Sequence, residues 1–244
     1  CITIKVAIPR ALLFYEYYPL WETFFTALGA KVVLSPKTTK EILQDSIKYC
    51  VNEACLPVKL FHGHVKSLIG KADYLFIPRL KSVEQMEYIC PKISGLPEMI
   101  KFSVPLDTPI IDTEVNLRRS KRTLKKSFLK AALYITDEKE KIKHAIKAAL
   151  VSYDNYLKAK KEGKTPSELL EKIRLKPVEN FEYNIAVLGH SYNLYDEYAS
   201  MGLLKKLNAE KVNVLTPEML DYSTIKTYSQ KIGKKVFWSL GKRQ

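Results

Sequence analysis

The sequence predicts an α/β protein made of two Rossmann-like units, each an open parallel sheet, joined by a helical and basic segment. Short β-rich runs alternate with helical patterns in the first 117 residues, and the alternation returns after residue 180. Residues 121–175 lie between them, are rich in Lys, Glu, Ala and Leu, and contain no strand candidate. Strands separated by helices need crossover connections, which make the strands parallel. We therefore divide the chain into 1–117, 118–180 and 181–244.

The expected strands are short runs rich in β-branched, aliphatic and aromatic residues. They are expected at Ile2–Ile8, Lys31–Leu34, Tyr74–Ile77, Pro109–Asp112, Asn184–Leu188, Val212–Leu215 and Val236–Trp238. The last run stands close to the end of the 244-residue sequence. We therefore expect the second unit to be truncated at its C-terminus.

The expected helices carry residues typical of helix starts and ends. A helix is expected over Leu12–Leu28, with Pro19 in the first turn of its main segment and Gly29 as its C-cap. Thr38 or Thr39 is expected to cap the next helix. Further helices are expected at residues 57–69, around 99–100, at 195–207, and within 121–175, where Thr165 and Pro166 begin the last one.

The composition, with 46% hydrophobic and 27% charged residues, is that of a globular protein. No uncharged apolar run approaches the roughly 18 residues that a membrane span needs. The N-terminus also has no basic and apolar leader, so we expect a cytoplasmic protein without a membrane. Four cysteines in such a chain indicate metal ligands, a reactive thiol or buried small residues rather than disulfides.

The net charge of +14 is concentrated in residues 118–176, which hold 18 Lys and Arg residues against 7 Asp and Glu residues. A solvated helical face is the simplest interpretation. Docking to an acidic partner or to a phosphorylated ligand is the alternative. We expect no nucleic-acid binding, because the segment lacks an interleaved series of aromatic residues that could stack on bases.

Cys55 and Cys90 are the strongest candidates for a chemical role. Cys55 stands two residues before Pro57, and Cys90 directly precedes Pro91. If each proline lies in a first helical turn, each sulfur lies at a helix N-terminus, where free N–H groups and the helix dipole favour a thiolate. Lys59, one turn beyond Cys55, would strengthen this effect.

Thiolates ligate iron and zinc, and the order Cys-Pro is familiar from iron–sulfur sites. The alternative is that Cys55 and Cys90 are buried small residues, which is also what we expect of Cys50. His62 and His64 are two residues apart and point to different sides of a helix. We therefore expect no two-His metal site, and a supporting polar contact from His62.

His190, Tyr192 and Asn193 follow an expected strand in the loop that opens a helix, where ligands bind in open α/β sheets. We consider them ligand-binding candidates, with capping or packing as the alternative. Arg10 and Arg79 each stand just past a strand, in the repeated order Ile-Pro-Arg. Two guanidinium groups on one sheet edge would bind phosphate or carboxylate, although surface arginines in loops are the other interpretation.

Several known motifs are absent from the sequence. It contains no Gly-x-Gly-x-x-Gly after the first strand, no phosphate-binding loop, no serine nucleophile elbow and no His-Glu-x-x-His. Only 9 of the 244 residues are glycines, which argues against a glycine-lined nucleotide cradle. A standard dehydrogenase, kinase or hydrolase is therefore not expected.

Several longer segments together resemble one family. They are Ile8-Pro9-Arg10-Ala11-Leu12, Tyr18-Pro19-Leu20-Trp21, Asn52-Glu53-Ala54-Cys55-Leu56-Pro57-Val58-Lys59, Phe61-His62-Gly63-His64, Ile77-Pro78-Arg79, Tyr88-Ile89-Cys90-Pro91 and Gly189-His190-Ser191-Tyr192-Asn193-Leu194-Tyr195-Asp196-Glu197. The chain resembles the acyl-CoA dehydratase activase-related family (DUF2229), which is similar to the subunits of 2-hydroxyacyl-CoA dehydratases. The resemblance covers most of the chain outside the basic segment.

This resemblance implies Rossmann-like domains that hold an iron–sulfur cluster of the 4Fe-4S type between them, with Cys55 and Cys90 as two ligands. It also implies an activase-type ATPase partner that injects one electron, after which the cluster drives radical dehydration of a 2-hydroxyacyl-CoA. A further ligand cysteine is implied in a Gly-rich loop of the last domain, yet no cysteine follows Cys90 here. The chain by itself then offers an incomplete ligand set, unless Cys50, another subunit or an exogenous ligand completes it.

Two functions follow as hypotheses. The first is an iron–sulfur protein that acts in low-potential electron transfer or in radical dehydration or reduction, either as an enzyme or as an accessory to one. The second is a module without a cluster that binds an acyl-CoA, another small molecule or an acidic protein through Arg10, Arg79 and the basic helices. Either one is compatible with a homo- or hetero-oligomer.

Overall fold

The computed structural model describes residues 3–118, 120, 122–171 and 181–231. The strands are β1 (Lys5–Ile8), β2 (Lys31–Leu34), β3 (Tyr74–Phe76), β4 (Arg79–Ser82), β5 (Ile110–Ile111), β6 (Glu114–Asn116), β7 (Tyr183–Ala186) and β8 (Val212–Leu215). The helices are α1 (Phe14–Ala27), α2 (Lys40–Tyr49), α3 (Leu56–Lys66), α4 (Pro91–Ser94), α5 (Leu96–Ser103), α6 (Arg122–Ala132), α7 (Lys139–Lys161), α8 (Pro166–Glu171), α9 (Ser191–Leu194), α10 (Leu203–Ala209), the 3-10 helix η1 (Pro217–Met219) and α11 (Tyr222–Lys231).

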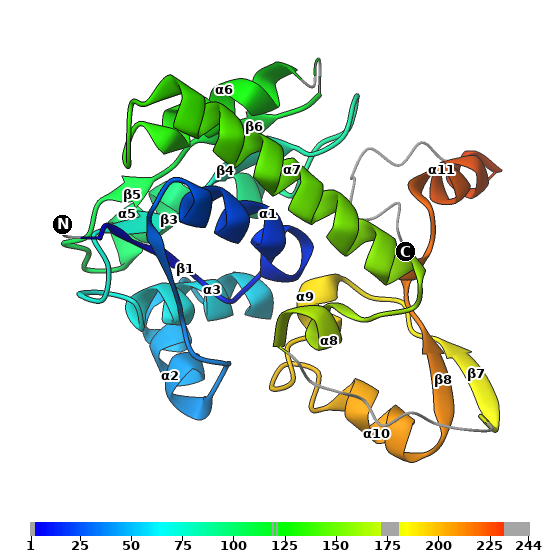
Figure 1. Cartoon of the computed structure of the whole chain (residues 1–244). Helices are drawn as coiled ribbons and strands as arrows, with labels where there is room; N and C mark the ends of the chain where they lie inside the picture. Colours follow the sequence, from blue (N-terminus) through cyan, green and yellow to red (C-terminus); the bar gives the residue numbers. More distant parts are fainter. Residues whose placement is uncertain (1–2, 119, 121, 172–180, 232–244) are drawn as a thin grey trace.

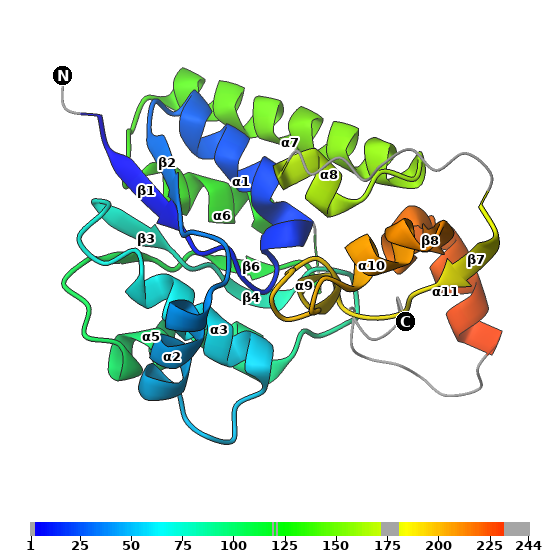
Figure 2. The ribbon, with the colours of Figure 1, turned by 90° about the horizontal axis from the view of Figure 1, so that it is seen from below.

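A four-stranded parallel sheet in the order β2-β1-β3-β5 forms the centre of the N-terminal half. Val6 of β1 pairs with Val32 on one side and with Tyr74 on the other. Helices α1, α6 and α7 cover one face of this sheet, and α2, α3 and α5 cover the other, as Figure 2 shows. The chain leaves β1 towards β2 and later returns to β3 on the opposite side. The strand order therefore reverses between β1 and β3, and in open α/β sheets this is where ligands bind.

Aromatic side chains of α1 fill the space between the sheet and the covering helices. The ring of Trp21 lies 4.5 Å from that of Phe76 and 5.0 Å from that of Phe128, centroid to centroid. Phe24 and Phe25 of the same helix are fully buried. Large aromatic side chains contribute most of the apolar area that a core removes from water, so α1 is the central helix of this half.

Pro19 lies in the interior of α1 and not in a first turn, which corrects the expectation from the sequence. A proline inside a helix leaves the carbonyl four residues earlier without its usual partner. Here that carbonyl belongs to Tyr15, and it accepts a hydrogen bond of 2.6 Å from the hydroxyl of Tyr156. A residue of α7 thus satisfies the backbone group that Pro19 frees.

Helices α6, α7 and α8 make up most of the described residues of the basic segment, which the sequence predicts to be helical. The longest of its helices, α7, lies along α1 (Figure 1). The start of α8 confirms the expected cap: the Glu168 N–H donates to Thr165 Oγ1 over 3.3 Å, and the Thr165 N–H donates to Glu168 Oε2 over 2.8 Å. These reciprocal bonds form a capping box.

Helices α2 and α3 pack closely because Gly63 faces α2. A Cβ atom at Gly63 would overlap the carbonyl oxygen of Ile42 and the hydroxyl of Ser46. Glycine allows such a close approach of two backbones. The cap of α2 is Thr39, whose Oγ1 accepts from the N–H of Ile42 over 3.3 Å. Thr38, the other candidate, makes different contacts.

The C-terminal part differs more from the expectation. The helix expected over 195–207 is replaced by α9, a turn and α10. The turn forms because the Asp196 carboxylate accepts hydrogen bonds of 3.0 Å from the N–H groups of Tyr198 and Ala199. Such side-chain bonds compete with helix formation. The sequence also does not predict β4 and β6, two strands that pair in parallel.

Strands β7 and β8 pair in parallel and lie apart from the four-stranded sheet (Figure 1). The mixed α/β class with parallel sheets is therefore confirmed. Two Rossmann-like units and the domain boundaries at 117 and 180 stay predictions, and the expected strand at Val236–Trp238 lies outside the described residues. Within the described ranges, no helix has the length and apolar character needed to cross a membrane.

Candidate functional site

Cys55 directly precedes α3, and its carbonyl oxygen accepts the first hydrogen bonds of that helix. The N–H groups of Val58 and Lys59 donate to it over 3.0 Å and 3.1 Å. Pro57 lies in the first turn, as the sequence predicts. Cys55 is a free and exposed thiol. Its side chain therefore stands beside the unpaired N–H groups of a helix start.

Cys90 repeats this arrangement at α4. Its carbonyl oxygen accepts hydrogen bonds of 3.0 Å from the N–H groups of Ile93 and Ser94, and Pro91 is the first residue of the helix. Cys90 is a free, half-buried thiol. The two cysteines thus share one local design on two neighbouring segments of the chain.

Tyr192 of α9 lies within electrostatic range of both cysteines. Burial raises the pKa of its phenol, and the negative charges of Cys55 and Cys90 raise that pKa further. Cys55 and Cys90 are therefore both within electrostatic range of this hydroxyl, which belongs to the C-terminal part. Tyr192 keeps its proton and can donate a hydrogen bond to a neighbouring anion.

A third cysteine lies next to this site. Cys50 is buried, and burial raises the pKa of its thiol, while the ammonium groups of Lys59 and Lys92 lower it. Lys92 also donates a hydrogen bond of 3.0 Å to the carbonyl oxygen of Glu53, which ties the loop before Cys55 to α4. Two lysines thus give this side of the site a positive potential.

The side chains at this site supply only part of the ligands that a metal cluster needs. Free thiols are the protein ligands of iron–sulfur clusters, and Cys55 and Cys90 present two of them. Among residues 3–118, 120, 122–171 and 181–231, no group of three or more His, Cys, Asp and Glu side chains could hold a metal ion. A cluster at this site would therefore need ligands beyond the described groups.

The two histidines of α3 take different partners. His62 Nδ1 lies 2.8 Å from the carbonyl oxygen of Val58 within the same helix. Burial lowers the pKa of its imidazole, and this backbone bond partly offsets the effect. His64 instead points to the loop after β2, where its ring nitrogens contact two hydroxyl groups.

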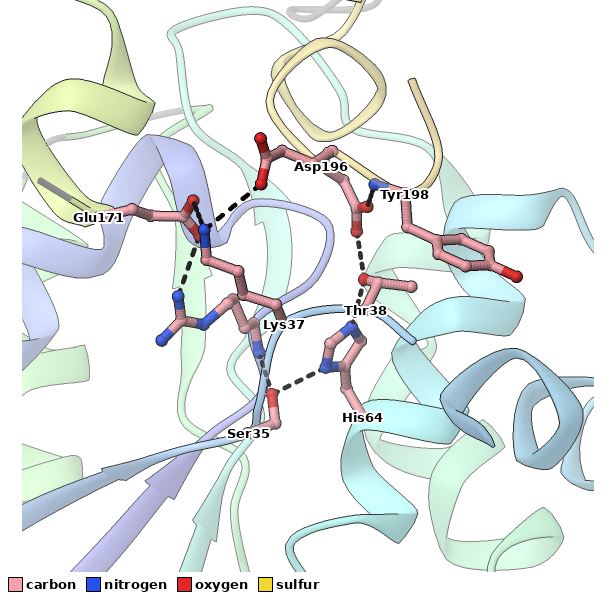
Figure 3. Close-up of polar contacts among 9 residues, drawn as sticks. Ser35, Lys37, Thr38, His64, Glu171, Asp196 and Tyr198 are labelled. Atoms are coloured by element: carbon pink, nitrogen blue, oxygen red, sulfur yellow. Dashed lines mark hydrogen bonds and ion pairs between the residues drawn. The ribbon is translucent and has the colours of Figure 1, made fainter. Parts of the chain in front are cut away.

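A chain of hydrogen bonds runs through His64 at the carboxyl ends of β1 and β2 (Figure 3). The backbone N–H of Arg10 donates to Ser35 Oγ over 2.8 Å. Ser35 Oγ lies 2.8 Å from His64 Nδ1, and His64 Nε2 lies 2.9 Å from Thr38 Oγ1. The Thr38 hydroxyl in turn donates to Asp196 Oδ2. The chain connects the central sheet to the segment that follows α9.

The carboxylate at one end of this chain and a neutral imidazole in its middle fix the direction of the bonds between them. An amide N–H can only donate, and a carboxylate can only accept. Thr38 gives its one hydroxyl hydrogen to Asp196, so Nε2 of His64 carries the proton and donates to Thr38. In a neutral ring Nδ1 then carries no proton and accepts from the Ser35 hydroxyl. This assignment of the tautomer follows from the network. It needs a neutral imidazole, and burial followed by the charge of Arg10 lowers the pKa of His64 to about 3.

Ion pairs surround the same edge of the sheet. Glu171 of α8 accepts from Arg10 Nη1 over 2.9 Å and lies 3.0 Å from the ammonium of Lys37. Its side chain is only 2% exposed. Lys37 also lies 3.5 Å from Glu197, which pairs with Lys205. Figure 3 shows that Glu171, Lys37 and Asp196 converge on this edge from three separate segments.

The two arginines expected to bind a ligand are thus both engaged by carboxylates. Arg10 is held by Glu171, as described. Arg79 is the first residue of β4. Its guanidinium donates two hydrogen bonds to the carboxylate of Glu98 and lies 3.4 Å from Asp112. Their role as ligand-binding residues stays a prediction.

His190 and Asn193 frame the start of α9. The carbonyl oxygen of His190 accepts from the Asn193 N–H over 2.8 Å, and the His190 ring lies 4.9 Å from that of Tyr192, centroid to centroid. Burial lowers the pKa of His190, whereas the charge of Glu16 raises it. Asn193 is exposed. Of this trio, Tyr192 is the residue whose pKa the two cysteines affect.

Reasoning from the sequence did not find the hydrogen-bonded chain. The feature of the sequence that could have indicated it is the pair of polar residues, Ser35 and Thr38, directly after a strand. Asp196 and Glu171 carry no local signature of their role. Their contribution depends on how distant segments of the chain meet.

A family model described as CoA enzyme activase uncharacterised domain (DUF2229) matches residues 5–220. The match includes both cysteines, the hydrogen-bonded chain and α9. No curated protein and no solved structure shows significant similarity to the chain.

Proposed function

We propose, from the premise that this chain belongs to the family described as CoA enzyme activase uncharacterised domain (DUF2229), that Cys55 and Cys90 are two ligands of an iron–sulfur cluster. The cluster, of the 4Fe-4S type, would supply single electrons at low potential to the dehydration or reduction of an acyl-CoA. An activase-type ATPase would be its partner. The observation that carries the proposal is the repeated placement of two free thiols, Cys55 and Cys90, each directly before a helix with proline in its first turn.

The chain's own residues support this role in three ways. The N–H groups of the first turns of α3 and α4 stand beside Cys55 and Cys90, where they favour negative charge. The ammonium groups of Lys59 and Lys92 add positive potential on the side of Cys50. Tyr192, which keeps its proton, can donate a hydrogen bond to a thiolate, and such bonds tune the potential of sulfur-ligated iron.

The ligands beyond Cys55 and Cys90 would come from Cys50, another subunit or an exogenous ligand. Cys50 is close to the site, yet its burial favours the protonated thiol. We therefore expect Cys50 to be a structural residue and the remaining ligands to come from elsewhere.

Anaerobic reconstitution with iron and sulfide tests the proposal. We expect a broad absorbance near 400 nm and an EPR signal after reduction in the wild type, and loss of both in the Cys55→Ser, Cys90→Ser double variant. Cys50→Ser is the matched control, because it also removes one free thiol, and it should leave the iron content unchanged. Equal iron and sulfide in the wild type and the double variant would exclude Cys55 and Cys90 as ligands.

A module without a cluster that binds an acyl-CoA or an acidic protein is the second candidate. The carboxylates around Arg10 and Arg79 weaken it, because both guanidinium groups already hold partners. Calorimetric titration with CoA compounds distinguishes the two candidates. Tight binding by metal-free protein that survives replacement of both cysteines would favour the second.

A further inference from the structure

A cavity of about 620 Å³ lies away from the cysteine site, between α1, α7, the strands β4 and β6, and the segment of η1 and α11. Its walls are mainly apolar and include Leu20, Trp21, Leu80, Val115, Leu157 and Leu220. Pockets that bind small organic molecules have volumes of roughly 300–1,000 Å³ and walls of this kind. The cavity therefore has the size and lining of a ligand site.

A second and smaller cavity of about 60 Å³ shares three walls with the first, formed by Tyr17, Trp21 and Leu80. It is also lined by Pro9 and Pro78, which follow β1 and β3. These are the strands between which the order of the sheet reverses. The larger cavity thus adjoins the edge of the sheet where open α/β proteins bind ligands.

Buried polar groups line and adjoin the larger cavity. Lys160 lines it and lies 3.6 Å from Glu16 behind it, and both side chains are nearly inaccessible to solvent. Glu218 also lines the cavity, and its carboxylate accepts a hydrogen bond of 3.0 Å from the Tyr195 hydroxyl. Burial and then the charge of Glu16 raise the pKa of Glu218. Such convergent polar groups in an apolar pocket orient a ligand.

The charges of the remaining wall nearly balance. Lys161 pairs with Asp221. Lys158 and Asp154 stand one helical turn apart on α7, and Glu84 also lines the cavity. These groups are two basic and three acidic side chains, so this wall carries little net charge that would attract an ion. Moving an ion into the apolar part of this space would cost desolvation energy.

We propose that this cavity binds an uncharged, largely apolar small molecule that carries an oxygen at one end. The apolar part would lie against Trp21, Leu80 and Val115, and the oxygen would contact Lys160 and Glu218. This site is separate from Cys55 and Cys90 and does not depend on a cluster.

Tryptophan fluorescence tests the proposal directly, because Trp21 lines the cavity. The chain has two tryptophans, and Trp238→Phe leaves Trp21 as the only one. We expect 1-octanol to shift the Trp21 emission to shorter wavelength in a saturable manner. Octanoate and octylammonium, which have the same chain and opposite charges, should bind at least tenfold more weakly.

Two neighbouring residues of α7 provide matched variants. Leu150 lines the cavity and is 40% exposed, whereas Val151 is 52% exposed and lines a separate hollow. Leu150→Glu should weaken octanol binding at least tenfold, and Val151→Glu should change it less than twofold. Replacement of both Cys55 and Cys90 by serine should leave octanol binding unchanged.

Three results would overturn the proposal: no saturable shift with octanol, binding of octanoate or octylammonium as tight as that of octanol, or equal losses in the Leu150→Glu and Val151→Glu variants. Loss of octanol binding in the Cys55→Ser, Cys90→Ser variant would also overturn it, because the site would then depend on the cysteines.

Discussion

Replacing His64 by leucine should reduce the acid sensitivity of the fold. In the folded state the imidazole is fully buried and its pKa is lowered to about 3, by burial and then by the charge of Arg10. In the unfolded chain a histidine has a pKa of about 6.5. Protons therefore bind the unfolded state first as the pH falls. This contribution to stability is complete above about pH 6.5 and is lost progressively as the pH falls towards 3.

The size of the effect follows from these two pKa values. Between pH 8 and pH 5, preferential protonation of the unfolded state should lower the free energy of unfolding by about 2 kcal/mol for His64 alone. His62, also buried and with a lowered pKa, acts in the same direction. The wild type should therefore lose more than this amount, and the difference between wild type and His64→Leu isolates the share of His64.

Urea unfolding followed by circular dichroism at pH 8 and pH 5, at constant ionic strength, measures this difference. At pH 8 the leucine variant should be less stable by roughly 2–4 kcal/mol, since Ser35 and Thr38 lose a buried partner. At pH 5 the gap should narrow by about 2 kcal/mol. His64→Gln keeps hydrogen-bonding capacity without titration and serves if the leucine variant does not fold.

His144 offers a matched control, because it is an exposed histidine of α7. His144→Asn should change the free energy of unfolding by less than about 0.5 kcal/mol at either pH. A wild type and a His64→Leu variant that lose the same stability between pH 8 and pH 5 would refute the neutral, buried imidazole. The assigned direction of the hydrogen-bonded chain would then fail with it.

Two further substitutions test the packing and the ion pairs. In thermal unfolding, Gly63→Ala should destabilise the fold by about 3 kcal/mol, because the new methyl group overlaps the backbone of α2. Gly95→Ala, whose methyl group would have ordinary contact distances, should destabilise it by less than about 1 kcal/mol in the same assay. Glu171→Gln should lower the free energy of unfolding by roughly 2–3 kcal/mol in urea, because it leaves the partly buried guanidinium of Arg10 without its charge partner. Glu140→Gln, in an exposed ion pair, should lower it by less than about 0.5 kcal/mol. Equal effects of the two variants would contradict the importance assigned to the buried pair.

The features that the sequence predicts correctly are those with local causes. A proline after each cysteine sets a helix start, and the structure has α3 and α4 begin there. Thr165 and Glu168 are three residues apart, and their capping box needs no partner from elsewhere. The strands of the central sheet are likewise evident, because parallel strands are buried on both faces and form short apolar runs.

The features that the sequence does not predict depend on distant contacts. Pro19 could stay inside α1 because Tyr156, far along the chain, donates to the carbonyl that the proline frees. The expected helix over 195–207 breaks because Asp196 bonds its own backbone and also accepts from Thr38, 158 positions earlier. Helix propensity cannot register either contact, since tertiary partners override it.

The hydrogen-bonded chain also has a consequence for the cysteine site. Helix α3 carries Cys55 at its start and His64 in its last turn, and the segment with Asp196 continues directly from α9, which carries Tyr192. The bonds from His64 through Thr38 to Asp196 therefore connect the element that bears a cysteine to the element that bears the phenol. We therefore expect the buried His64 to help align α3 with the segment that follows α9.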